Sequence, residues 1–334
     1  MAALPGQEVA LLELVSGSTS ALARRLADEP ELRRRLALER LSAAVCAELE
    51  TAGLLDELPA DYAAELRRAR LEVLRRQLIN EGLTVELTRL AGELQPVVLK
   101  GVHFARLLYP PGARSSVDID LFCPRRLYDE LRRRLARGGW LTREHGAYAR
   151  RLYRTWVHLS WQKDDRSLEV HFDLVPPGRY RGYDELWANR RPLELESGRV
   201  YVPRLEDAAL FALAHLAKEH LFERHLLWVL DLHRLAPLVD WATVKGNARR
   251  CGLERLYDFA LAYLRRFPAL RRRLPPGAIL PADDYRFRLL KSTGGLQLRA
   301  RLLGLLLCQS PARALTYGLS RLLWPLVRRA GERH

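Results

Sequence analysis

The segment SSVDIDLFCP (residues 115–124) places two aspartates inside what otherwise reads as a buried β-strand. Residues two apart in a strand point to the same face of the sheet, so Asp118 and Asp120 lie side by side. The opposite face is apolar and consists of Val117, Ile119 and Leu121. Two carboxylates at this spacing repel each other unless something compensates their charge. Either this face of the strand is open to water, or it binds a cation.

A second strand, SLEVHFDL (residues 167–174), has the same design. Glu169, His171 and Asp173 fall on one face, and apolar residues alternate with them. If the two strands are neighbours, about 5 Å apart, then Asp118, Asp120 and Glu169 converge. Three oxygen donors of this kind suit Mg²⁺, which proteins hold with one or two carboxylates plus substrate phosphates and water. The alternative is two ordinary amphipathic strands with a wet outer face, because a lone D-x-D is a weak motif.

The segment VVLKG (residues 97–101) predicts a short strand that ends in glycine and opens into a helix. Such a junction presents backbone N–H groups and the positive end of the helix dipole to an anion. Gly101 allows close approach of a phosphate, Lys100 adds a positive charge, and Arg114 is near enough in sequence to reach the same phosphates. The structural alternative is that Gly101 is only a turn and Lys100 only a solvated strand end.

The change of hydrophobic period along the chain divides it into three regions. Leucines at three- and four-residue steps predict helices in residues 1–94, and helical patterns return in residues 204–334. Between them, residues 95–203 read as strands interleaved with helices, among them the basic stretch RRLYDELRRRLAR. We therefore predict an α+β fold with a mixed core between two helical regions.

Composition sets broad limits on the function. The chain has 334 residues, 48% of them hydrophobic and 28% charged, which is typical of a folded globular protein. Its net charge of +15 favours a polyanionic partner, although coding bias towards arginine would produce the same number. The four cysteines form no C-x-x-C pair, and we find neither a secretory signal nor a transmembrane segment. We therefore expect a cytoplasmic protein.

The ordered set of these motifs resembles a known family. VVLKGVHFARLLYPPGARSSVDIDLF, followed by LEVHFDL, is similar to the uncharacterised nucleotidyltransferase branch of the DNA polymerase β-like superfamily. The shared features are an L-K-G strand end, a tyrosine–proline turn, an arginine, a D-I-D-L strand and a later strand with an acidic residue two positions before a histidine. The resemblance covers roughly residues 90–255 and is weak outside them.

The resemblance implies a polymerase β-like nucleotidyltransferase core and a role for each matching residue. Asp118 and Asp120 would hold two Mg²⁺ ions, with Mn²⁺ as an alternative, and Glu169 would be the third carboxylate and orient the acceptor hydroxyl. Gly101 would line the nucleotide pocket, and His171 would face the same cleft.

The chain departs from the superfamily at the phosphate turn. Gly101 is followed by Val102 where the wider superfamily has serine, so the hydroxyl contact to phosphate is either missing or supplied by nearby residues. The candidates are Lys100, Ser115 and Ser116, and we include Ser116 among the predicted nucleotide-binding residues together with Lys100, Gly101, Arg114 and His171.

The function implied is Mg²⁺-dependent transfer of a nucleoside monophosphate from an NTP, with ATP as the first choice. The acceptor would be a hydroxyl or phosphate of a small molecule, peptide or protein. An RNA- or tRNA-directed transferase and a catalytically silent basic binding protein remain as alternatives. Two polar residues downstream have structural interpretations instead: Asp231 as a buried, hydrogen-bonded aspartate and His215 as a histidine on a helix surface.

Overall fold

A computed structural model of the chain describes residues 19–142, 158–174, 184–219, 226–275 and 315. The first helices are α2 (Thr19–Asp28), α3 (Pro30–Leu38) and α4 (Ser42–Thr51), followed by the 3₁₀ turn η1 (Leu55–Glu57). Their leucines at four-residue steps, such as Leu22 and Leu26, are buried. The helical pattern predicted for this part of the chain is confirmed over its described residues.

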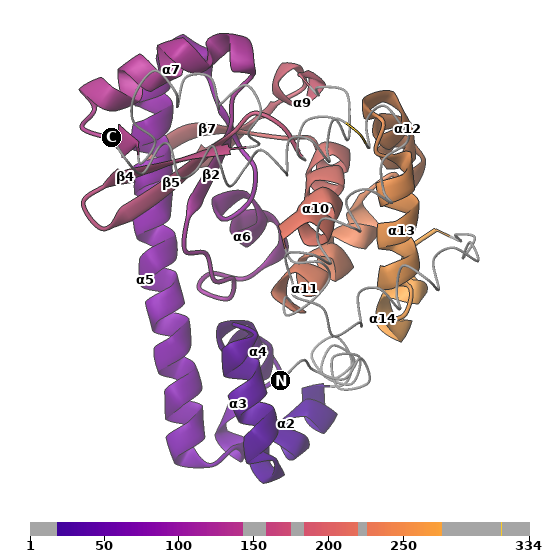
Figure 1. The fold of residues 1–334 in the computed structure, drawn as a ribbon. Helices are drawn as coiled ribbons and strands as arrows, with labels where there is room; N and C mark the ends of the chain where they lie inside the picture. The colour runs from indigo at the N-terminus through magenta and orange to yellow at the C-terminus, as the bar shows by residue number, and fades with distance from the viewer. Residues whose placement is uncertain (1–18, 143–157, 175–183, 220–225, 276–314, 316–334) are drawn as a thin grey trace.

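Helix α5 (Ala60–Ala91) connects the N-terminal helices to the sheet. Figure 1 shows it running along one side of the molecule, from α2–α4 at one end to α7 at the other. Its last turns bury Leu83, Val85, Leu87 and Ala91 in the same apolar cluster as sheet residues. The 3₁₀ turn η2 (Gly92–Leu94) then leads into the sheet.

The described strands form one mixed seven-stranded sheet with the order β3-β4-β5-β2-β1-β7-β6. The strands are β1 (Val97–Val98), β2 (Ile119–Phe122), β3 (Leu141–Thr142), β4 (His158–Lys163), β5 (Arg166–His171), β6 (Arg191–Leu195) and β7 (Gly198–Val202). β2 is parallel to β5 and antiparallel to β1, while β1 is parallel to β7. The strands of the two acidic segments are therefore direct neighbours.

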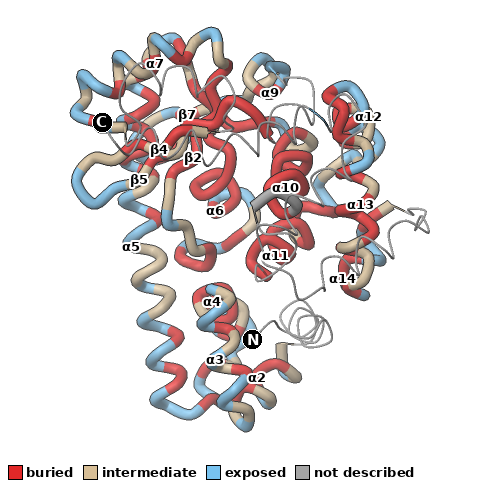
Figure 2. The backbone as a smooth tube through the Cα atoms, viewed as in Figure 1, coloured by how far each residue is buried: buried red, intermediate tan, exposed pale blue. Residues whose placement is uncertain are grey.

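Each face of the sheet packs into a separate apolar cluster. Ile119 and Leu121 point to the side of α5 and α7 (Arg125–Arg137). Val97 and Phe122 point to the side of α6 (Val102–Leu108), α10 (Leu205–Glu219) and α11 (Leu226–Leu235). Figure 2 shows the buried backbone gathered in the sheet, α6, α10 and α11. The aspartate of β2 thus faces the α6 side, at the centre of the molecule.

The remaining elements complete the outer shell. They are α9 (Glu185–Ala188), the 3₁₀ turn η3 (Ala236–Leu238), α12 (Trp241–Cys251), α13 (Glu254–Leu264) and α14 (Pro268–Arg271). Asp240 caps α12 by accepting hydrogen bonds from the N–H groups of Ala242 and Thr243. Among the residues that the structure describes, no helix combines the length and apolar character needed to cross a bilayer.

The predicted α+β fold, with a mixed sheet among helices, is confirmed. Two local details differ from the sequence expectations. Val117 precedes β2 and is 55% exposed instead of sharing the apolar face, because the strand starts only at Ile119. The hairpin β6–β7 was not predicted, although it supplies the parallel neighbour of β1. The boundaries drawn after residues 94 and 203 stay a prediction.

Candidate active site

Three carboxylates converge where β2 and β5 run side by side. Asp120 lies directly opposite Glu169 in the parallel register, and Asp118 precedes β2 by one residue. One oxygen from each of Asp118, Asp120 and Glu169 lies within 4.8 Å of the others. The side chain of Asp120 is completely buried, whereas those of Asp118 and Glu169 stay 32% and 26% exposed. The cluster is therefore anchored at its base and open to a ligand on one side.

Lys100 places its ammonium group between two of these carboxylates. Its Nζ lies 3.1 Å from Asp120 Oδ2 and 3.5 Å from Asp118 Oδ2. Nζ also lies 5.1 Å from the ring centroid of Trp228, within cation–π range. Burial opposes the charged form, but the carboxylates of Asp120, Asp118 and Glu169 outweigh it and raise the pKa of Lys100. Lys100 is thus a charged counter-ion of the acidic cluster.

His171 holds the buried end of the cluster. Its Nε2 lies 3.0 Å from Asp120 Oδ1 and 3.4 Å from Glu169 Oε2. Despite burial, these two carboxylates raise the pKa of His171. Burial alone would raise the pKa of Asp120, but Lys100 and His171 lower it below its usual value. Asp120 is therefore ionised and fixed in orientation.

The two outer carboxylates respond differently to their surroundings. Burial opposes ionisation of Glu169, yet its hydrogen bond with His171 and the nearby His158 lower its pKa to about 2. The pKa of Asp118 is raised by burial and by the adjacent Asp120, against the attraction of Lys100. Asp118 is the carboxylate whose negative charge is least compensated, which is the property that favours binding of an added cation.

His158 is a member of the site that the sequence analysis did not single out. It pairs with His171 across the antiparallel strands β4 and β5, and its Nε2 lies 3.8 Å from Glu169 Oε1. His158, Glu169 and His171 form a second set of closely spaced donor atoms that shares Glu169 with the first. The signal was present in the alternating segment WVHLSWQ, but only the strand register places its histidine beside the acidic cluster.

Gly101 and Ser116 lie against each other beside Asp118. Gly101 begins α6 with φ 58° and ψ −103°, a conformation that L side chains rarely adopt. A Cβ at this position would lie 2.9 Å from Ser116 Oγ. Ser116 Oγ in turn donates a hydrogen bond to the backbone oxygen of Asp118, 3.1 Å away. The turn thus requires glycine, and its predicted contact with phosphate stays a prediction.

Arg114 is engaged inside the protein. Its Nε and Nη2 donate to the two carboxylate oxygens of Asp231, at 2.9 and 2.7 Å, and Tyr109 Oη donates to the same aspartate at 2.7 Å. Arg114 and Asp231 are both buried. The interpretation of Asp231 as a buried, hydrogen-bonded aspartate is confirmed. The contact of Arg114 with nucleotide phosphates stays a prediction. In this structure the guanidinium group of Arg114 is already paired with the carboxylate of Asp231.

The expectation of an exposed His215 is wrong. The residue is 6% exposed, and its ring packs 4.4 Å from that of Trp228, between centroids. Lys100 Nζ and Arg114 Cζ lie 5.1 and 5.8 Å from the ring centroid of the same Trp228, so this indole lies between His215 and the two cations.

Comparison with known families agrees with this geometry. The sequence matches an uncharacterised nucleotidyltransferase family over residues 26–268. The chain belongs to this family. The match begins well before residue 90, so the N-terminal helices from residue 26 onward are part of the family's common architecture. No curated protein matches the chain.

Membership of a nucleotidyltransferase family implies transfer of a group from an NTP. Reactions of this kind use divalent metal ions, and the acidic cluster has the oxygen donors to bind one. Asp120 Oδ2 is buried, makes no hydrogen bond with the described residues and already faces a cation, the ammonium of Lys100. Carboxylate oxygens are the ligands that Mg²⁺ prefers. The donor set of Asp118, Asp120 and Glu169 therefore fits a hard divalent ion.

Proposed function

We propose that this family member transfers a nucleoside monophosphate from an NTP, with ATP preferred, to a hydroxyl or phosphate acceptor and releases pyrophosphate. The observation that carries the proposal is the convergence of Asp118, Asp120 and Glu169 in a nucleotidyltransferase-family fold. The acceptor oxygen would form a bond to the α-phosphorus, the bond from that phosphorus to the bridging oxygen would break, and a hydroxyl acceptor would release its proton to water. The pyrophosphate would leave with the electron pair of that bond.

Each residue of the cluster has a part in this proposal. Asp118 and Asp120 would hold two Mg²⁺ ions, or Mn²⁺ in their place, with Glu169 as the third ligand. When bound, the ions would neutralise the phosphate oxygens and the leaving pyrophosphate. Glu169, ionised because its pKa is about 2, would also accept a hydrogen bond from the acceptor hydroxyl and orient it. His171 would keep the Asp120 carboxylate in position through its 3.0 Å contact.

The residues of the α6 turn would bind the nucleotide. Gly101 would let the phosphates approach the backbone, and Ser116 would supply a hydroxyl beside it. When the ions bind, the ammonium group of Lys100 would move from the carboxylates to the phosphates. The ammonium group and a metal ion cannot both occupy the position beside Asp118 and Asp120. We also propose that the reaction takes place in the cytoplasm, since three of the cysteines, Cys46, Cys123 and Cys251, are free thiols.

Calorimetric titration of ATP, GTP, CTP and UTP, with and without Mg²⁺, tests the proposal. We expect Mg²⁺-dependent binding that weakens at least about tenfold in Asp118→Asn/Asp120→Asn. Asp164→Asn/Asp165→Asn is the matched control, since it makes the same charge change at exposed positions in the β4–β5 turn. Pyrophosphate release should follow the same pattern during an acceptor screen. Binding that ignores both the metal and the active-site substitutions would contradict the two-ion mechanism.

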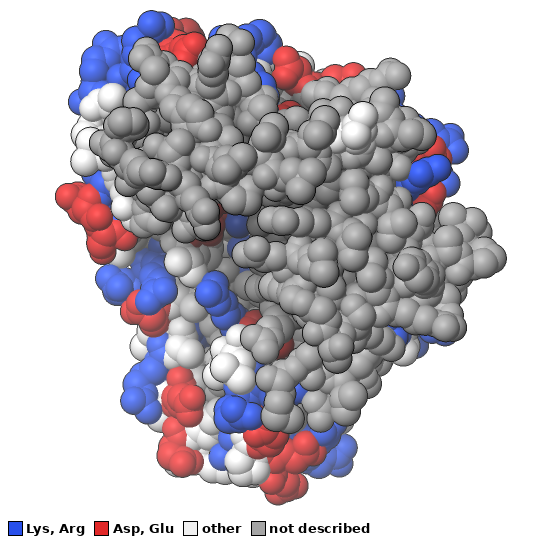
Figure 3. All heavy atoms as spheres, in the orientation of Figure 1, with Lys and Arg blue, Asp and Glu red and all other residues white. Residues whose placement is uncertain are grey.

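An RNA acceptor is a second candidate, favoured by the net charge of +15. Figure 3 shows, however, that Lys and Arg are interspersed with Asp and Glu along α5 and the N-terminal helices on this face. Many of these arginines are paired, for example Arg75 and Arg76 with Glu72. Binding of tRNA that weakens steeply with salt would favour the RNA acceptor. A silent binding protein would instead keep its partner after Asp118→Asn/Asp120→Asn.

A further inference from the structure

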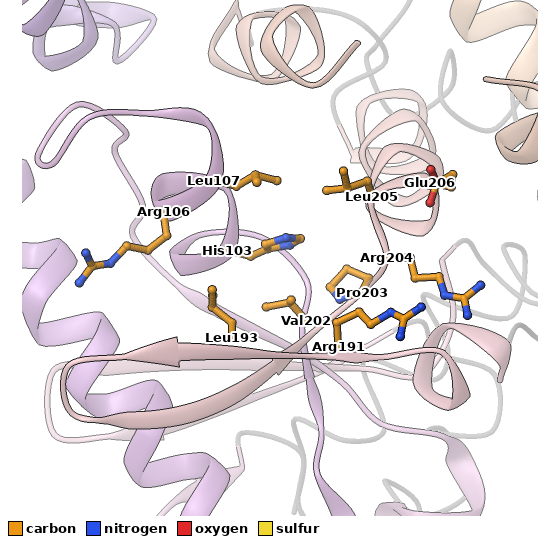
Figure 4. Close-up of a pocket in the computed structure, with 10 residues that line it drawn as sticks. All are labelled: His103, Arg106, Leu107, Arg191, Leu193, Val202, Pro203, Arg204, Leu205 and Glu206. Carbon is orange, nitrogen blue, oxygen red and sulfur yellow. The ribbon is translucent and has the colours of Figure 1, made fainter. Parts of the chain in front are cut away.

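A pocket of about 600 Å³ lies between α6, the β6–β7 hairpin and the start of α10 (Figure 4). It is lined by His103, Arg106, Leu107, Arg191, Leu193, Val202, Pro203, Arg204, Leu205 and Glu206. None of these is a residue of the acidic cluster or of the α6 turn. The volume falls within the range of small-molecule sites, about 300–1,000 Å³.

The chemistry of the walls is that of a ligand site. Half of the lining residues are apolar. They come from α6, from the β6–β7 hairpin and from the start of α10 with the preceding Pro203, so polar groups interrupt an apolar surface. Such sites bind the body of a ligand by burial of apolar surface and orient it through a small number of polar contacts. The polar lining residues are three arginines, one histidine and one glutamate.

The arginines give one side of the pocket a positive charge. Arg106 is held by Glu81, to which its Nε and Nη2 donate at 2.8 and 2.6 Å. Arg191 and Arg204 are exposed, and neither makes an ion pair with any residue in the described part of the chain. Figure 4 shows their side chains running to the same end of the pocket, with Glu206 as the acidic residue of the lining. Two guanidinium groups are therefore available to an oxyanion, which they bind with a planar fork of donors.

His103 adds a buried polar group without a partner. It is 4% exposed, and its Nδ1 forms no hydrogen bond with the described residues. Burial and the nearby Arg114 lower the pKa of His103 to about 4, so the imidazole is neutral at physiological pH. A buried polar atom without a partner is unfavourable, and a ligand in the pocket would satisfy it. Figure 4 shows the ring between Leu107 and Val202, among the lining side chains.

We propose that this pocket is a second binding site, for a phosphate monoester that carries an apolar group. The phosphate dianion matches Arg191 and Arg204, the apolar group matches the leucine and valine walls, and His103 contacts the body of the ligand. The pocket is distinct from the carboxylate cluster, with which it shares no residue.

The test is calorimetric titration of phenyl phosphate, phenol and benzoate into the full chain without Mg²⁺. We expect one phenyl phosphate to bind with a Kd of about 1 mM or below, and the other two probes to bind at least about tenfold more weakly. Arg191→Gln/Arg204→Gln should weaken phenyl phosphate at least about tenfold. Arg24→Gln/Arg68→Gln, which removes the same charge from exposed positions on α2 and α5, should bind it as the wild type does.

Further variants separate this site from the acidic cluster. Asp118→Asn/Asp120→Asn should leave phenyl phosphate binding unchanged, and His103→Leu should weaken it, with circular dichroism confirming that both variants are folded. Absence of binding, or equal binding by wild type and Arg191→Gln/Arg204→Gln, would overturn the proposal. Equal binding of benzoate would overturn the assignment to a phosphate. Loss of binding in Asp118→Asn/Asp120→Asn would place the probe in the nucleotide site instead.

Discussion

At the scale of single residues, Lys100 stabilises a group of like charges that would otherwise repel. Asp120 lies in β2, Asp118 precedes that strand by one residue, and Glu169 lies in the neighbouring strand β5, so that one oxygen of each is within 4.8 Å of the others. The ammonium 3.1 and 3.5 Å from the two aspartates neutralises part of this charge in the absence of metal. A buried carboxylate that loses a cationic partner is destabilised, because the low local dielectric leaves its charge less compensated.

Lys100→Met should therefore destabilise the metal-free protein by about 3 kcal/mol. Mg²⁺ should restore more of the stability of this variant than it adds to the wild type, because the ion replaces the missing positive charge. Urea denaturation with and without Mg²⁺ measures both quantities. Lys245→Met is the control, since Lys245 pairs with Glu254 and Asp258 at the surface, where such pairs contribute about 0–1 kcal/mol. A Lys100→Met protein as stable as the wild type without Mg²⁺ would contradict this role.

At the scale of elements, the connection between α6 and β2 is fixed to α11. Tyr109, the first residue of that connection, and Arg114, near its middle, both bind Asp231. This contact holds the chain immediately before the aspartate strand and brings α11, with Trp228, against Lys100. The orientation of the acidic strand thus depends on a residue more than a hundred positions away.

Asp231→Ala should lower the free energy of unfolding by about 3–5 kcal/mol, because the Arg114 guanidinium is left buried and unpaired. Arg114→Met/Asp231→Leu should recover much of this loss, and a double-mutant cycle with the single variants Arg114→Met and Asp231→Leu in urea measures the coupling. If Arg114 also binds nucleotide, the stable double variant will still have reduced NTP affinity. A loss in the double variant equal to the sum of the losses in Arg114→Met and Asp231→Leu would show that the pair is not coupled.

Helix α11 also makes the stability of the protein sensitive to acid. Burial and the nearby Arg273, Arg234 and Arg272 lower the pKa of His233 to about 4. The unfolded chain binds a proton at this histidine near pH 6.5, so between about pH 6.5 and 4 the unfolded state holds more protons than the folded state. Stability should therefore fall with decreasing pH through this window, by about 1.4 kcal/mol per pH unit for this group.

His233→Leu should remove that part of the slope. Guanidinium denaturation of wild type and variant between pH 4 and 8 measures it. At pH 8, where the histidine is neutral in both states, the difference reports packing alone and serves as the control. Parallel stability curves across the whole range would rule out the contribution of His233.

At the scale of the whole molecule, α5 joins the N-terminal helices and the sheet into one structure. Its first half contacts α4, and its last turns share an apolar cluster with β2, β5 and α7. A boundary at residue 94 would separate this helix from the sheet that it covers. We therefore expect the N-terminal region and the core to unfold together.

Leu87→Ala should lower the free energy of unfolding by about 2–5 kcal/mol, because it opens a cavity against the sheet. The matched control on the same helix is Leu78→Ala, at a position 53% exposed, which should change stability by less than about 0.5 kcal/mol. Calorimetric scans should show a single transition that moves as a whole. Two transitions, only one of them displaced by Leu87→Ala, would instead support an independent N-terminal domain.

Local sequence patterns predicted most of the elements and a set of candidate site residues, but not the β6–β7 hairpin. The alternation in SSVDIDLF and SLEVHFDL predicts two strands with acidic faces, the LKG junction predicts a strand that ends at a helix, and the ordered set identifies the family. These features are local, because strand alternation and helix boundaries depend on neighbours within a few residues. The alternation picked out Asp118, Asp120 and Glu169 as a candidate set, and the resemblance implied a role for each of them.

Which of these residues meet depends on strand register and helix packing. The tertiary structure sets Asp120 opposite Glu169, brings His158 into the cluster, and inserts the β6–β7 hairpin beside β1. It also pairs Lys100 with the carboxylates of the cluster and Arg114 with Asp231. A charged side chain that becomes buried must find a compensating partner, and that partner can come from any part of the chain. Local sequence does not specify it, because strand register and helix packing are settled by the burial of the whole core.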